Sequence, residues 1–227
     1  MSIAQHFTSE ETDPHCVPAL EAAALLFDAP WRRFGVVGDS LSAGTGDPRP
    51  GYASQPWADR VADALRRVAP DLTYRNVAVG GATTEHALDQ LDRLTDFAPD
   101  LLHLPSGAND IVRRAPDYAR IEKDLRELYR RAAATGAQLT TFTLGRAYRI
   151  PEFDDWTERV RTVNAITRML AAEYRAVLVD MWDHPVNDRA DLLSADRIHF
   201  AANGQAVLAA EMVKQLAHRL GQRVRSS

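Results

Sequence analysis

The sequence predicts an α/β fold in which a five-stranded parallel sheet is covered by helices on both faces. Two observations predict it: short apolar runs of strand length recur along the chain, and longer segments between them carry apolar residues three and four positions apart. Such alternation is typical of right-handed strand–helix–strand crossovers, which build parallel sheets. Polar residues just after each strand are therefore expected at one edge of the sheet, where ligands bind in open sheets of this kind.

The strands and helices are predicted in alternation. The expected strands are Phe34–Val37, Tyr74–Val79, Leu101–Leu104, Leu139–Leu144 and Val177–Met181. The expected helices are a short amphipathic one over Val17–Phe27, then Trp57–Val68, Glu85–Leu94, Tyr118–Ala134, Trp156–Tyr174 and Ala201–Leu220. We expect one domain over residues 33–221, preceded by an N-terminal extension (1–32) and followed by a flexible tail (222–227).

Composition narrows the class of partner. The 227 residues carry a net charge of −4, with 27 Lys and Arg residues scattered among 31 Asp and Glu, so no basic stripe indicates nucleic acid or a membrane surface. The single cysteine and the absence of Cys/His metal spacings predict neither a disulfide nor a bound metal, and no cofactor is expected. The acidic N-terminus lacks the basic start of a secretory signal, which favours a cytoplasmic protein.

Two distant segments carry residues suited to nucleophilic catalysis. Gly38-Asp39-Ser40-Leu41-Ser42 follows the first predicted strand, and Asp196-Arg197-Ile198-His199 precedes the last predicted helix. A serine hydroxyl attacks a carbonyl only when a base removes its proton, and a histidine does this best when a carboxylate holds its other ring nitrogen. The two segments together predict a hydrolase with Ser40, His199 and Asp196 as its triad.

Donors for an oxyanion follow two other strands. Gly80-Gly81 comes after the second strand and Gly107-Ala108-Asn109-Asp110 after the third. Acyl transfer needs hydrogen-bond donors aimed at the developing negative charge. The backbone N–H groups of Ser40 and Gly81 and the side-chain amide of Asn109 could supply them.

These segments resemble the four sequence blocks of the SGNH branch of the GDSL esterase and lipase family. The blocks match at Gly38–Ser42, Asn76–Gly81, Gly107–Asp110 and Asp196–His199, in the family's order, and the resemblance runs from about Arg33 to Leu220. It implies a flavodoxin-like three-layer α/β/α sandwich, with Ser40 as nucleophile, Gly81 and Asn109 as oxyanion donors, and Asp196 and His199 completing the triad. Phe200 stands where many members have proline, and the extension through Trp31 has no counterpart in the family.

Each block also has a structural interpretation. Ser40 could belong to a turn or helix cap, Gly80 and Gly81 to a tight turn, and Asp196 and His199 to a solvated pair. For Asp110 we favour a role in capping the helix that follows, and for Asp39 a role in its own loop. His184 is the rival histidine, and Asp180 and Asp183 are the rival acids.

A phosphate-binding loop is excluded at residues 38–46, because neither the Gly-Lys-Ser/Thr of a P-loop nor Gly-x-Gly-x-x-Gly is present. The prediction is therefore a serine esterase that cleaves a small or medium acyl ester, a small-molecule substrate, through an acyl-enzyme. An acyltransferase using the same site is the alternative. A non-catalytic flavodoxin-like module that binds a small molecule is the alternative from another class.

The expected substrate wall combines apolar side chains and arginines. It comprises Ile111, Arg146, Tyr148, Ile198 and Phe200. We expect activity on soluble short-chain esters, because no long apolar lid segment is evident in the sequence. Arg146 or Arg149 could steer an anionic substrate, or both could pair with surface acids such as Glu152 and Asp154.

Overall fold

Five parallel strands form the centre of the protein. The computed structural model describes residues 9–224, and the sheet has the order β2-β1-β3-β4-β5. The strands are β1 (Arg33–Val36), β2 (Thr73–Asn76), β3 (Leu101–His103), β4 (Gln138–Phe142) and β5 (Val177–Val179). The predicted five-stranded parallel sheet is confirmed.

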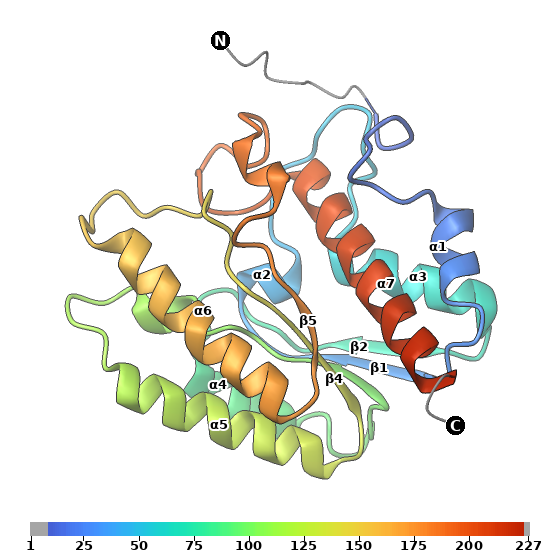
Figure 1. Cartoon of the computed structure of the whole chain (residues 1–227), viewed down its shortest axis with the longest axis horizontal. Coiled ribbons are helices and arrows are strands. Elements are labelled where there is room, and N and C mark those ends of the chain that lie inside the picture. The colour runs from blue at the N-terminus through green and yellow to red at the C-terminus, as the bar shows by residue number, and fades with distance from the viewer. Residues whose placement is uncertain (1–8, 225–227) are drawn as a thin grey trace.

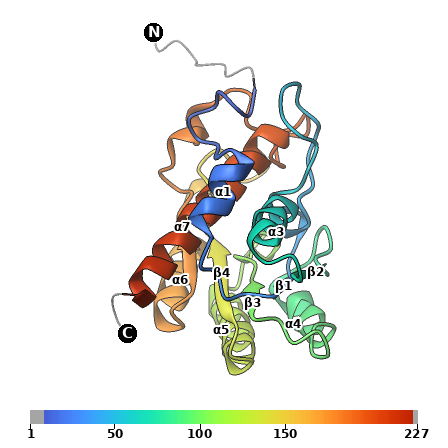
Figure 2. The same cartoon turned by 90° about the vertical axis from the view of Figure 1, so that its right-hand side faces the viewer.

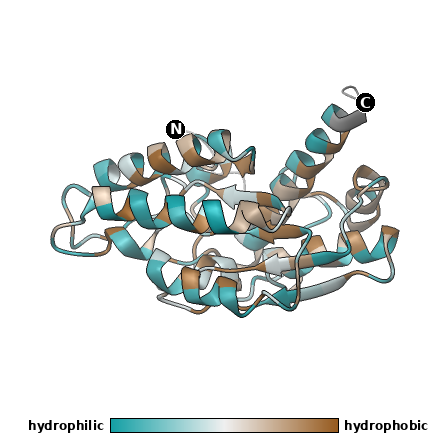
Figure 3. Ribbon diagram, turned by 90° about the horizontal axis from the view of Figure 1, so that it is seen from below, coloured by the Kyte–Doolittle hydropathy of each residue, from teal (hydrophilic) through white to brown (hydrophobic). Residues whose placement is uncertain are grey.

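Helices cover both faces of this sheet (Figures 1 and 2). One face carries α1 (Ala19–Leu25), α3 (Trp57–Val68) and α7 (Ala202–Val224), and the other α4 (Thr84–Asp92), α5 (Tyr118–Ala134) and α6 (Trp156–Glu173). Successive strand residues face opposite layers: Leu101 packs in the core beneath α3 and α7, and Leu102 in the core beneath α4 and α5. Figure 3 shows hydrophobic and hydrophilic residues alternating around the helices, as expected when one side of each packs on the sheet.

The predicted elements differ from the observed ones mainly at their ends. The second strand was expected to reach Val79 but ends at Asn76, whose side-chain oxygen accepts the Ala78 N–H at 3.0 Å and turns the chain. Three short helices were not predicted: α2 (Ser40–Ala43), η1 (Asn109–Ile111) and η2 (Pro185–Asp188). Helix α7 continues to Val224, into the segment expected to be a tail, whose last residues (225–227) lie outside the described part.

The N-terminal segment packs onto the domain rather than apart from it. Its expected helix is present as the shorter α1, and residues 1–8 lie outside the described part. Leu26 and Trp31, only 0% and 2% exposed, share a hydrophobic core with Phe34 of β1. Within residues 9–224, no helix is long and apolar enough to cross a membrane.

The strand order determines where a ligand site can form. The chain moves from β1 outward to β2 and then back across to β3, so the order reverses at β1. In such sheets the crevice lies beyond the carboxyl ends of the strands on either side of the reversal. The segments after β1, β2 and β3 therefore meet at this crevice.

Candidate active site

Ser40 lies at the first position of α2, immediately after β1. The turn into the helix needs a glycine at position 38, where φ is +140° and a Cβ atom would overlap the Ser42 hydroxyl. The Gln90 side chain fixes this turn, accepting the Gly38 N–H at 2.6 Å and donating to the Gly38 carbonyl at 2.9 Å. The Ser40 side chain is thereby held at the pocket described below.

Asp39 stabilises the same turn. Its carboxylate accepts the backbone N–H groups of Leu41 at 3.0 Å and Ser42 at 3.4 Å, capping α2. Burial raises the pKa of the Asp39 carboxyl, and these hydrogen bonds oppose the rise. The structure thus places Asp39 in its own loop, as expected.

Gly81 and Asn109 face the same pocket from two other loops. Gly81 has a φ of +78° in the turn closed by the Ala82 N–H bond to the Val79 carbonyl, a conformation that favours glycine. The Asn109 amide nitrogen donates one hydrogen to the Ala82 carbonyl at 3.0 Å. An amide nitrogen has two hydrogens, so the second remains for a ligand.

The acid and the histidine form a pair in the loop before α7. Asp196 Oδ2 lies 2.6 Å from His199 Nδ1, and Asp196 Oδ1 accepts the backbone N–H groups of Ile198 and His199 at 2.9 and 3.0 Å. Desolvation would raise the pKa of Asp196, but the hydrogen bonds from His199 and from this backbone hold it below its usual value. An ionised carboxylate only accepts, so Nδ1 carries a proton, and in the neutral form of the ring Nε2 is the nitrogen with the lone pair.

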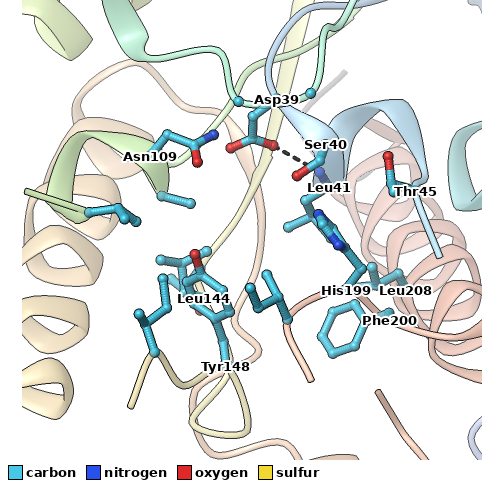
Figure 4. Close-up of a pocket in the computed structure, with 18 residues that line it drawn as sticks. Asp39, Ser40, Leu41, Thr45, Asn109, Leu144, Tyr148, His199, Phe200 and Leu208 are labelled. Carbon is cyan, nitrogen blue, oxygen red and sulfur yellow. Dashed lines mark hydrogen bonds between the residues drawn. The ribbon is translucent and has the colours of Figure 1, made fainter. Parts of the chain in front are cut away.

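Ser40, Gly81, Asn109 and His199 line one pocket of about 410 Å³ (Figure 4). Figure 4 shows the His199 ring beside Ser40, with Asn109 facing them from the opposite side of the pocket. The other lining residues are mostly apolar, and include Leu41, Val112, Leu144, Tyr148, Ile150, Ile198, Phe200 and Leu208. The arrangement brings together a serine hydroxyl, an imidazole paired with a carboxylate, and several N–H donors next to an apolar cavity.

Three of the five predicted wall residues line this pocket: Tyr148, Ile198 and Phe200. Ile111 does not, because it ends the short helix η1 with its side chain fully buried in the core against α5 and α6. Arg146 also lies outside the pocket lining and pairs with Asp188 at 2.6 Å, rather than with Glu152 or Asp154.

The rival residues do not reach the pocket. His184 Nε2 lies 3.6 Å from Glu211, and its ring packs against His15. Asp180 pairs with Arg168 at 2.6 Å, and Asp183 is exposed outside the pocket lining. Among residues 9–224, no group of three or more His, Cys, Asp or Glu side chains is placed to hold a metal ion.

Comparison with known proteins identifies the family. Residues 36–207 match the GDSL-like Lipase/Acylhydrolase family. The chain belongs to this family. As a GDSL-like acylhydrolase it is a carboxylic ester hydrolase acting on small-molecule esters, which sets aside the non-catalytic module. None of the curated protein sequences searched matches the chain.

Several solved structures, esterases among them, share the fold. The structure resembles the psychrotrophic esterase EstA from Pseudoalteromonas sp. (TM-score 0.65, 20% identity, covering 84% of this chain and 99% of EstA). It also resembles TesA (TM-score 0.64, 25% identity, covering 81% and 97%). A third similar structure is Axe2, an acetylxylan esterase from Geobacillus stearothermophilus (TM-score 0.64, 20% identity, covering 82% and 94%).

Several pocket residues of this GDSL family member were missed in the sequence. Val112 takes the place expected for Ile111, because η1 turns Ile111 inward. Leu144 lies just after β4, and its position after a strand was a usable signal. Leu208 reaches the pocket from α7, and nothing in its spacing indicates that.

Proposed function

We propose that this enzyme cleaves small to medium acyl esters through a covalent acyl-enzyme on Ser40, with His199 as base and Asp196 as the acid of the triad. The observation that carries the proposal is that Ser40, His199 and Asn109 line one pocket while Asp196 Oδ2 lies 2.6 Å from His199 Nδ1. Nucleophile, base and orienting acid in one cleft are the requirements of acyl transfer by serine.

The proton follows the hydrogen bonds of the pair. His199 Nε2 accepts the Ser40 proton as Oγ attacks the ester carbonyl, and the imidazolium is stabilised by Asp196. The imidazolium then gives the proton to the leaving alcohol, and the acyl group stays on Ser40. Water then attacks the acyl-enzyme while the same imidazole takes its proton. The bond from the acyl carbon to Ser40 Oγ breaks, the acid leaves, and the imidazolium returns the proton to Oγ.

The negative charge that develops on the carbonyl oxygen needs donors. The backbone N–H of Ser40, the backbone N–H of Gly81 and the free hydrogen of the Asn109 amide are the candidates, since all three residues line the pocket. Donors fixed before the reaction stabilise the oxyanion without reorganisation. The bond from Asn109 to the Ala82 carbonyl supplies that fixation.

The apolar part of the pocket would hold the acyl chain. The volume of the whole pocket, about 410 Å³, lies toward the lower end of the range for small-molecule sites. Neither Arg146 nor Arg149 lines the pocket, so neither is placed to steer an anionic substrate. The cytoplasmic location and the absence of a cofactor remain predictions from the sequence.

Tyr148 adds a polar group to this apolar wall. Its ring packs edge-on against Trp156 at 5.2 Å, and the Trp156 indole N–H donates to the Tyr148 carbonyl at 2.8 Å, so the residue is held in place. Within residues 9–224 the Tyr148 hydroxyl has no hydrogen-bond partner, which leaves it available to an oxygen atom on the substrate.

Hydrolysis rates for p-nitrophenyl esters of increasing chain length test the proposal. We expect acetate to hexanoate esters to be cleaved, with activity lost in Ser40→Ala and His199→Ala. Ile150→Trp, which narrows the cavity, should lower the hydrolysis rates of the longer esters and leave the rate for the acetate ester unchanged. Activity retained in Ser40→Ala, or a preference for long emulsified esters, would contradict the proposal.

Tyr148→Phe tests the polar contact separately. A lost hydrogen bond of about 1 kcal/mol corresponds to roughly a fivefold loss in kcat/KM. We expect that loss for a 3-hydroxybutyrate ester and little change for the matching butyrate ester. An equal loss of kcat/KM for both esters would show that the Tyr148 hydroxyl does not contribute to substrate selectivity.

A further inference from the structure

The N-terminal segment that the family match leaves out is fastened by a buried ionic cluster. Asp13, whose side chain is fully enclosed, pairs with Arg189, whose side chain is 7% exposed. Asp13 also accepts the Tyr52 hydroxyl at 2.7 Å and the His15 N–H at 3.0 Å. A buried charge is costly unless it is paired and hydrogen-bonded, so this cluster fixes the position of residue 13 firmly.

Arg189 begins the loop that carries the proposed acid and base, which we call the histidine loop (residues 189–201). The loop closes on itself through an antiparallel bridge between Leu193 and Phe200 and through the Ser194 N–H bond to the His199 carbonyl at 2.7 Å. Asp196 and His199 lie at its tip, and Arg197 between them has a φ of +60°. The hydrogen bonds of residues 196–199 run within the loop itself, so the placement of the tip depends on how the ends of the loop are anchored.

The loop after α2 supports the histidine loop from the other side. Asp47 donates its N–H to the Ser194 hydroxyl at 2.8 Å, and its carboxylate accepts the Ala195 N–H at 2.8 Å. Gly46 lies so close to the Phe200 carbonyl that a Cβ atom there would overlap it. Tyr52, which donates to Asp13, belongs to the same stretch of chain. Asp13 therefore joins the two segments that hold the His199 backbone.

We propose that Asp13 is a positioning residue for His199, and that residues 9–18 act as a strap that holds the histidine loop against Ser40. The inference rests on the proposed function only in taking His199 as the base. A displacement of about 1 Å between reacting groups can lower turnover by up to a hundredfold. Loss of the Asp13 anchor therefore lowers turnover by letting the loop shift, although Asp13 never touches substrate.

Asp13→Ala tests this directly. We expect kcat to fall at least about tenfold with KM within twofold of the parent value, and fluorophosphonate labelling of Ser40 to slow in parallel. All measurements are made well below each variant's unfolding temperature, determined by circular dichroism.

The matched control is Glu10→Gln. Glu10 fastens the same strap to Arg60 of α3 and to the Ala53 N–H, away from the histidine loop. We expect this variant to lose stability but keep its kcat. If Asp13→Ala does not fold, Asp13→Asn is measured instead, and its kcat should fall at least threefold.

The possible outcomes distinguish a failure of the strap proposal from a failure of the proposed function. A folded Asp13 variant with unchanged kcat overturns the strap, as does an equal loss of kcat in Glu10→Gln. If Ser40→Ala is inactive in the same assay, the proposed function stands whatever the Asp13 result. If Ser40→Ala remains active, the proposed function itself fails.

Discussion

Asp110 accepts two hydrogen bonds from Thr84, one from the backbone N–H and one from the hydroxyl, both at 3.0 Å. The sequence had suggested that Asp110 caps the helix after it, but it caps α4, the helix after Gly81. Together with the bond from Asn109 to the Ala82 carbonyl, this ties the loop after β3 to the loop after β2. The two loops that supply the proposed oxyanion donors Gly81 and Asn109 are therefore fixed to each other.

Asp110→Ala should reduce both stability and turnover. It leaves the buried Thr84 groups unpaired, at a cost of about 1–3 kcal/mol in the free energy of unfolding. We expect kcat to fall about tenfold as the donors move apart. The control is Asp117→Ala, which removes the cap on the Arg120 N–H of α5 and should cost about 1 kcal/mol without changing kcat. Equal losses of kcat in the two variants would show that the bonds between the loops after β2 and β3 do not hold the oxyanion donors in place.

Asn109→Ala should weaken binding of the transition state far more than binding of the substrate. Removing one oxyanion donor lowers kcat on the order of a hundredfold, with little effect on KM. Steady-state kinetics on one short-chain ester measures both constants. A normal kcat with a raised KM would make Asn109 a ground-state contact or a purely structural residue.

Asp196→Asn should impair catalysis less than loss of His199. The asparagine can still accept a hydrogen bond from Nδ1, but it does not stabilise the imidazolium by charge. We expect a kcat between those of the parent and His199→Ala, and no effect of Asp183→Asn, because Asp196 and not Asp183 lies against His199 Nδ1. If Asp183→Asn lowered kcat and Asp196→Asn did not, Asp183 would be the acid of the triad.

The Glu211 carboxylate should stabilise the fold at neutral pH and lose this contribution in acid. Desolvation would raise its pKa, but the neighbouring His184 ring and the Lys214 ammonium lower it from 4.5 to about 2. Because the folded value lies below the unfolded one, the stabilisation is present above pH 4.5 and is lost as the pH falls toward 2. The full difference corresponds to about 3 kcal/mol, more than half of it lost by about pH 3.

Urea unfolding of the parent and Glu211→Gln at pH 7 and near pH 3 measures this contribution. The parent should be the more stable protein at pH 7, and the gap should shrink near pH 3. A gap that is independent of pH would show that Glu211 does not contribute through its charge.

Sequence predicted those site residues that follow a strand or precede the last helix. Ser40, Gly81 and Asn109 follow β1, β2 and β3, so strand order alone brings them to one edge. Asp196 and His199 are close in sequence, and their pairing needs no long-range information. The fold was predictable for the same reason, because alternating strands and helices specify the layers.

Side-chain direction in short irregular segments was not predictable. Ile111 neighbours the proposed site in sequence, but the single turn of η1 directs it into the core and leaves Val112 at the pocket. The pairing of Asp13 with Arg189 spans 176 positions and belongs to no regular element. Such contacts depend on tertiary packing, which no local pattern encodes.

The central claim, that Ser40 is the nucleophile, is tested most directly by mass spectrometry after treatment with a fluorophosphonate. Ser42, two positions on and buried, provides the neighbouring control. We predict one phosphonyl group on the Ser40 peptide of the parent and of Ser42→Ala, and none on Ser40→Ala, which should also be inactive. Labelling at another residue, or undiminished ester hydrolysis by Ser40→Ala, would contradict the account.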